Sequence, residues 1–115
     1  MKVDWISFFQ EEKEILILKI QEESLSDPAL NKDFESLLLH AITPGGKVLV
    51  DLSKVTFMNS YAIRALLVGL EECKTRQAQL ALCEVRSEIK MTMRVLHIAD
   101  LLPIYSTRQD ALASM

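Results

Sequence analysis

Short runs of consecutive apolar residues alternate along this chain with longer segments whose apolar residues recur at helical spacing. The clearest runs cover residues 15–20, 47–52 and 79–84. Strands that are apolar on both faces are typical of a sheet covered by helices on both sides. Strands that alternate with helices predict a parallel or mixed sheet with right-handed crossovers. The pattern therefore predicts an α/β fold with a mixed, mostly parallel sheet of four to five strands.

The helices are placed by start signals, stop signals and apolar spacing. Asp27 and Pro28 mark a good helix start, because Asp can cap a helix and Pro is tolerated in its first turn. The turn signal at residues 43–46 ends that helix. Further helices are predicted over residues 60–76, over 87–96, and from Ser106 or Thr107 to 113. We expect these residues to face the core from the last two helices: Met91, Val95, Ile98 and Leu112.

The remaining segments complete the predicted order of elements. A weakly strand-like segment that ends at Phe8 and Phe9 is expected to form an antiparallel edge hairpin with the strand at 15–20. A short last strand is expected within residues 101–105. Residues 22–26 and 53–59 are expected to be loops. Since 115 residues suit one domain, we expect residues 1–115 to form a single domain.

Composition excludes several classes of protein. Lys and Arg are scattered among acidic residues and the net charge is −3, which argues against nucleic-acid binding. No signal peptide is visible, and no apolar stretch reaches the roughly 20 residues of a membrane span, so we expect a cytoplasmic protein without membrane insertion. Cys73 and Cys83 lie among apolar residues without metal-ligand spacing, which predicts buried free thiols and no cofactor or metal.

The most informative segment is the junction at residues 48–63, where a strand leads through a connection into a helix at Ser60. In open α/β sheets, binding sites form where strand ends meet helix starts. The unpaired N–H groups and the dipole of a helix start favour an anion there. A phosphoryl group on Ser60 would add about two negative charges and change the surface that a partner sees. The plain alternative is that Ser60 serves only as the helix N-cap.

The same junction resembles the STAS domain of bacterial anti-sigma factor antagonists. The family pattern is an apolar strand, Asp or Asn, Leu, a short loop, an apolar pair and then Asp-Ser-Ser-Gly-Leu at a helix start. Here Asp51 and Leu52 follow the strand, and the helix start reads Asn59-Ser60-Tyr61-Ala62-Ile63. The element order of nearly the whole chain agrees with the family.

The resemblance implies a function as well as a fold. In the family, a kinase that is also the anti-sigma factor phosphorylates the first serine of Asp-Ser-Ser, which corresponds to Ser60. The unphosphorylated domain binds that kinase, which then releases its sigma factor, and phosphorylation reverses the binding. The implied partners are this kinase and a phosphatase. Asn59, Tyr61 and Ala62 replace the usual Asp, Ser and Gly, and the Gly-x-Leu-Asp stretch of many members is absent at 21–25.

Four neighbours of Ser60 are further candidates for partner binding. Asn59 is either a turn or cap residue or a recognition residue, and Tyr61 is either a half-exposed aromatic or a partner contact. Asp51 is expected to end its strand by accepting hydrogen bonds from nearby loop amides, with partner binding as the alternative. Ala62, two residues after Ser60, is also a candidate for partner binding.

Two other functions compete with a phosphorylation switch. An enzyme is disfavoured, because the chain has neither a GxSxG elbow nor a P-loop, and both His40 and His97 fit structural or solvent-facing roles better than a catalytic base. A non-switching STAS scaffold or a module associated with a transporter, including lipid-trafficking complexes, would need the same fold and no kinase. Neighbouring genes would separate the switch from this module: a kinase and a phosphatase would favour the switch, and a transporter would favour the module.

Overall fold

The computed structural model describes residues 5–10 and 14–115. Its main sheet contains five strands in the order β1-β2-β4-β6-β7. The strands are β1 (Ile6–Gln10), β2 (Ile15–Ile20), β4 (Lys47–Asp51), β6 (Gln79–Cys83) and β7 (Ile104–Tyr105). β1 pairs with β2 in the antiparallel sense and every other pair is parallel, which confirms the predicted mixed sheet and its edge hairpin.

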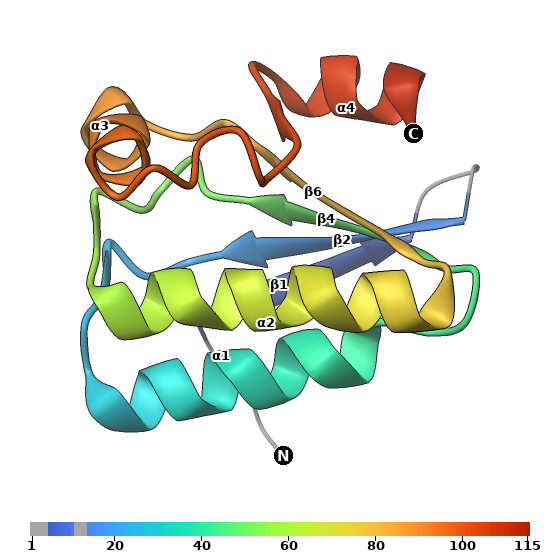
Figure 1. The fold of residues 1–115 in the computed structure, drawn as a ribbon, viewed down its shortest axis with the longest axis horizontal. Helices are drawn as coiled ribbons and strands as arrows, with labels where there is room; N and C mark the ends of the chain where they lie inside the picture. Colours follow the sequence, from blue (N-terminus) through green and yellow to red (C-terminus); the bar gives the residue numbers. More distant parts are fainter. Residues whose placement is uncertain (1–4, 11–13) are drawn as a thin grey trace.

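In the described residues three helices connect strands and a fourth follows the last strand. They are α1 (Pro28–Ala41), α2 (Ser60–Arg76), α3 (Ser87–Val95) and α4 (Arg108–Ser114). α1 and α2 lie side by side on one face, and α4 lies on the opposite face (Figure 1). The predicted start signals explain where α1 and α4 begin, because the side chains of Asp27 and Thr107 accept hydrogen bonds from backbone N–H groups of the first turn.

The alternation of side chains along the central strands divides the core into two clusters. The larger one lies between the sheet and α1 and α2, where Phe34, Leu38 and Leu66 are fully buried. The smaller one lies under α4 and includes Ile17 and Cys83. Both cysteines are buried free thiols, as predicted, and burial raises the pKa of Cys83 to about 12.

Two segments that were expected to be loops contain short strands. β3 (Ser24–Leu25) and β5 (Phe57–Met58) pair in parallel and form a separate two-stranded sheet. Leu25 and Met58 are buried in the main core, and this burial fixes a pairing that two isolated dipeptides could not maintain. The connection that leads to Ser60 is therefore ordered by the connection that precedes α1.

The apolar face predicted for α3 is wrong. Ile89 and Met93 face the core, whereas Met91 and Val95 are exposed. Both pairs are spaced by four residues and lie on opposite sides of the helix, so periodicity alone did not distinguish them. Ile98 is buried as expected, but it lies beyond the end of α3.

In the last helix, α4, Ala111 is the fully buried residue and Leu112 is half-buried beside it. In the described part of the chain, no helix combines the length and the apolar character that crossing a bilayer requires.

Candidate functional site at the start of helix α2

The segment between β4 and α2 is held at several points by main-chain hydrogen bonds. Leu52 N–H donates to Cys83 O at 3.1 Å, just beyond the strand ends. Farther along, Thr56 N–H donates to Glu23 O at 2.8 Å, and Asn59 N–H donates to Leu25 O at 3.2 Å. These bonds connect the approach to Ser60 with the connection before α1. These bonds hold the start of α2 in a defined position.

Asn59 is the N-cap of α2, so an N-cap role for Ser60 is excluded. The Oδ1 atom of Asn59 accepts hydrogen bonds from Ala62 N–H at 3.0 Å and from Asn31 Nδ2 at 2.9 Å. Its Nδ2 atom donates to Ser26 O at 3.2 Å. Aspartate, the usual residue in the family, could accept the first two bonds but could not donate the third. The amide at position 59 thus serves as the link between α1, α2 and the connection that precedes α1.

Ser60 occupies the first helical position and its side chain is exposed. Its hydroxyl makes no hydrogen bond within residues 5–10 and 14–115, because Asn59 performs the capping. The first turn of α2 contains no acidic residue. An exposed hydroxyl at the positive end of a helix, with no carboxylate in that turn, lies where an added anion is favoured.

Two large exposed side chains flank this serine. Phe57 is 53% exposed and Tyr61 is 66% exposed. α3 packs against β5 and adds the exposed Met91 and Val95 to this end of the molecule. Large exposed apolar side chains mark a surface for protein binding where they form a contiguous patch.

The Ala62 side chain is fully buried, which is incompatible with the direct partner contact predicted for it. Ala62 contributes its backbone N–H to the cap. Asn59 is half-buried and occupied by its three hydrogen bonds. Of the predicted residues, Ser60 and Tyr61 are therefore the ones that present most of their side chains to solvent.

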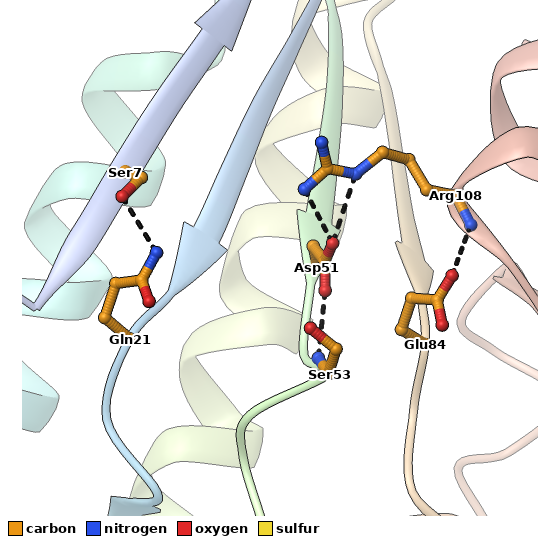
Figure 2. Close-up of polar contacts among 6 residues, drawn as sticks. All are labelled: Ser7, Gln21, Asp51, Ser53, Glu84 and Arg108. Carbon is orange, nitrogen blue, oxygen red and sulfur yellow. Dashed lines mark hydrogen bonds and ion pairs between the residues drawn. The ribbon is translucent and has the colours of Figure 1, made fainter.

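Asp51 is buried, with 3% of its surface exposed. Its carboxylate is hydrogen-bonded to Ser53 and Arg108 (Figure 2). Its Oδ1 atom accepts from Ser53 N–H at 2.9 Å, which confirms the predicted bond to a loop amide. Its Oδ2 atom accepts from Arg108 Nε at 3.1 Å and Nη2 at 2.8 Å. Arg108 N–H also donates to Glu84 Oε2 at 2.8 Å, so α4 is attached to the ends of β4 and β6.

Burial alone would raise the pKa of Asp51, but the hydrogen bonds from Ser53 and Arg108 hold this pKa below its ordinary value. The Arg108 pair was not anticipated from sequence. The available signal was an acidic residue at the end of an apolar strand, which must find a cation or amide partner when the sheet is covered. The identity of that partner depended on where α4 packs. A direct contact between Asp51 and a partner protein is not compatible with its burial.

No arrangement for catalysis accompanies Ser60 among the described residues. His40 and His97 are both exposed, and His40 Nδ1 lies 2.8 Å from Ser36 O in its own helix. Neither imidazole forms a hydrogen bond with a serine hydroxyl in the described part. The described residues also contain no group of His, Cys, Asp or Glu side chains suited to a metal ion.

The sequence profile of the STAS domain matches residues 9–111, so this chain belongs to the STAS family. Its fold is similar to that of an anti-sigma-factor antagonist (STAS) domain protein from Planctomyces limnophilus, with 29% identity, a TM-score of 0.81 and coverage of 95% of each chain. A search of curated proteins found no match.

Two more distant structures show the same fold. The Bacillus cell fate determinant SpoIIAA, solved in its phosphorylated form, has 13% identity and a TM-score of 0.70, and the alignment covers 95% of this chain and 97% of SpoIIAA. A sulfate transporter family protein from Wolinella succinogenes has 17% identity and a TM-score of 0.72, with coverage of 87% and 83%.

Proposed function

We propose that this STAS domain is a cytoplasmic regulatory protein of the anti-sigma factor antagonist type, controlled by phosphorylation of Ser60. The observation that carries the proposal is the exposed Ser60 hydroxyl at the first position of α2, which has no hydrogen bond to any described residue. The similarity to the anti-sigma-factor antagonist from Planctomyces limnophilus supports it. The partners are a serine kinase that also acts as anti-sigma factor, and a phosphatase.

The kinase would transfer the γ-phosphoryl group of ATP to Ser60 Oγ, with loss of the hydroxyl proton and release of ADP. The phosphatase would return the hydroxyl by hydrolysis. The unmodified surface around Ser60, including Phe57 and Tyr61, would bind the kinase. An unpaired double negative charge in such an interface can cost several kcal/mol of binding free energy, and about 1.4 kcal/mol already changes affinity tenfold.

Substitution of Ser60 provides the direct test. We expect Ser60→Asp to weaken binding to the cognate anti-sigma kinase at least tenfold, because a carboxylate introduces charge where the partner docks. Ser60→Ala should bind like the unmodified protein and should accept no phosphate. Binding is measured by titration calorimetry, and modification by mapping phosphate after incubation with kinase and ATP. Equal binding by both variants, or phosphate only at another residue, would contradict the proposal.

Tyr61 should contribute to binding without contributing to stability. Because its side chain is 66% exposed, Tyr61→Ala should leave the melting temperature within about 2 °C of the unmodified protein. Loss of an aromatic anchor should reduce affinity for the kinase about tenfold or more. Lys74→Ala, at the other end of α2, is the matched control and should bind normally. If Tyr61→Ala and the control bind equally well, Tyr61 does not belong to the interface.

The second candidate is a STAS module that acts without a kinase, as a scaffold or beside a transporter. The fold shared with the sulfate transporter family protein and the replacement of the usual Asp-Ser-Ser by Asn59-Ser60-Tyr61 favour it. This alternative predicts that no cognate kinase modifies Ser60 and that Ser60→Asp and Ser60→Ala bind the partner equally well.

A further inference from the structure

Arg64 lies one helical turn beyond Ser60 on the exposed side of α2. Each residue of an α-helix is rotated by about 100°, so residues four apart are offset by only about 40° around the axis and are neighbours on the surface. Helical side chains lean toward the N-terminus of their helix. The Arg64 side chain therefore has the reach and the direction to cover the turn that contains Ser60. The buried residues of α2 lie on the opposite side: Ala62, Ile63, Ala65, Leu66, Gly69 and Cys73.

The Arg64 guanidinium is exposed and makes no hydrogen bond or ion pair within the described ranges. The other two basic residues of α2 are engaged, Lys74 with Glu71 and Arg76 with Glu72. Arg64 and Tyr61 line one side of a groove of about 340 Å³ between α2 and α1.

The α1 side of this groove contributes Lys32 and Glu35, whose charges are opposite. Glu35 forms no ion pair with Arg64 in the described part of the chain. The first turn of α2 has no acidic residue. Arg64 is therefore a basic side chain one turn from Ser60 that has no ion pair among the described residues.

We propose that Arg64 is the positioning residue for phosphorylated Ser60 and binds its phosphoryl group across one turn of α2. This inference rests on the proposed phosphorylation of Ser60 and assigns the group that responds to it. An anion four residues before a cation is the favourable orientation on a helix. The planar guanidinium can donate two parallel hydrogen bonds to phosphate oxygens. The phosphoryl group would then lie against the side of α2 in one orientation, stabilised also by the helix dipole.

The test uses full-length protein with phosphoserine incorporated at position 60 during synthesis, so that no kinase is needed. The second ionisation of the phosphate is followed by ³¹P NMR titration. A guanidinium bound to the phosphate stabilises the dianion. The phosphate pKa should therefore be lower in the phosphoserine protein that keeps Arg64 than in the same protein with Arg64→Gln. For a pair of ordinary strength at this spacing the difference is about 0.2–0.4 of a pH unit. Phosphorylation should also shift the Arg64 Nε–H resonance.

Two matched variants separate a specific contact from a general effect of charge. Arg64→Lys should retain part of the pKa shift. Lys74→Gln removes one positive charge from the same helix, about 20 Å from Ser60 along the helix axis. Its phosphate should titrate like that of the phosphoserine protein that keeps both Arg64 and Lys74. The inference would be overturned if the phosphate titrates identically with Arg64 and with Arg64→Gln, or if Arg64→Gln and Lys74→Gln shift the phosphate pKa equally. Failure of the proposed function would instead appear as absence of phosphate on Ser60 after incubation with kinase.

Discussion

Arg108→Met is expected to lower the free energy of unfolding at pH 7 by about 2–3 kcal/mol, one of the largest effects of a single substitution outside the apolar core. The variant leaves the Asp51 carboxylate buried with Ser53 as its remaining partner in the described part of the chain. Removing one member of a buried pair costs about 3–5 kcal/mol, and the partial exposure of Arg108 (28%) places the expected value below that range. Urea unfolding measures the difference.

The same pair predicts a dependence on pH. Since the pKa of Asp51 is lower in the folded protein, its contribution is fully present above the unfolded value of about 3.9 and is lost as the pH falls through the folded value. The difference in stability between the unmodified protein and Arg108→Met should therefore shrink below about pH 4. Arg94→Met, on the exposed side of α3, is the control and should change stability by less than about 0.5 kcal/mol at any pH. A constant difference from pH 7 to pH 3 would contradict the assignment.

Asn59→Ala is expected to destabilise the protein by about 2–4 kcal/mol. It removes the cap of α2, worth about 1 kcal/mol, and leaves Asn31 Nδ2 buried without its partner, which costs about 1–3 kcal/mol more. Asn31 is 5% exposed, and its Oδ1 atom already lacks a partner among the described residues. Thermal and urea unfolding of the variant measure the loss.

Three companion variants test the origin of this effect. Thr107→Ala removes an exposed cap from α4 without stranding a buried amide, and it should cost only about 1 kcal/mol. Asn59→Asp keeps both acceptor bonds and should lose less than Asn59→Ala. In an Asn31→Leu background the cost of Asn59→Ala should fall, because no buried amide is left unpaired. An equal cost of Asn59→Ala in both backgrounds would show that the link to α1 contributes nothing.

These two networks explain how the start of α2 is kept in place. Asn59 connects the start of α2 to α1 and to Ser26. Asp51, at the end of β4 where the connection to α2 begins, is bound to Arg108 of α4. A rigid support of this kind allows Ser60 and Tyr61 to be exposed without disorder at the helix start. Under the proposed function, a phosphoryl group changes the charge and shape of this corner while the backbone is retained.

Much of the fold could be predicted from local patterns. The runs at β2, β4 and β6 are apolar on both faces, which favours a covered sheet, and their alternation with helices favours parallel pairing. Asp27 before Pro28, and Thr107 before α4, act through side-chain bonds to the next few residues, so the ends of those helices are encoded locally. Asn59 marks the helix start at Ser60 in the same local way, through its bond to Ala62 N–H. The partner that binds at Ser60 is not encoded in these local patterns.

Other features depended on residues far apart in the chain. β3 and β5 are two residues each, and they exist because Leu25 and Met58 are buried against the same core. The buried side of α3 was decided by packing, since Ile89 with Met93 and Met91 with Val95 satisfy the same helical spacing.

The amino-acid sequence by itself determined the α/β class, the order of the main elements and the helix start at Ser60, because periodicity and capping act over a few residues. Only the tertiary structure decided that Asn31 binds Asn59 and that Arg108 pairs with Asp51. These contacts join residues 28 and 57 positions apart, and a buried amide or carboxylate takes whichever partner the packed elements bring within hydrogen-bonding distance.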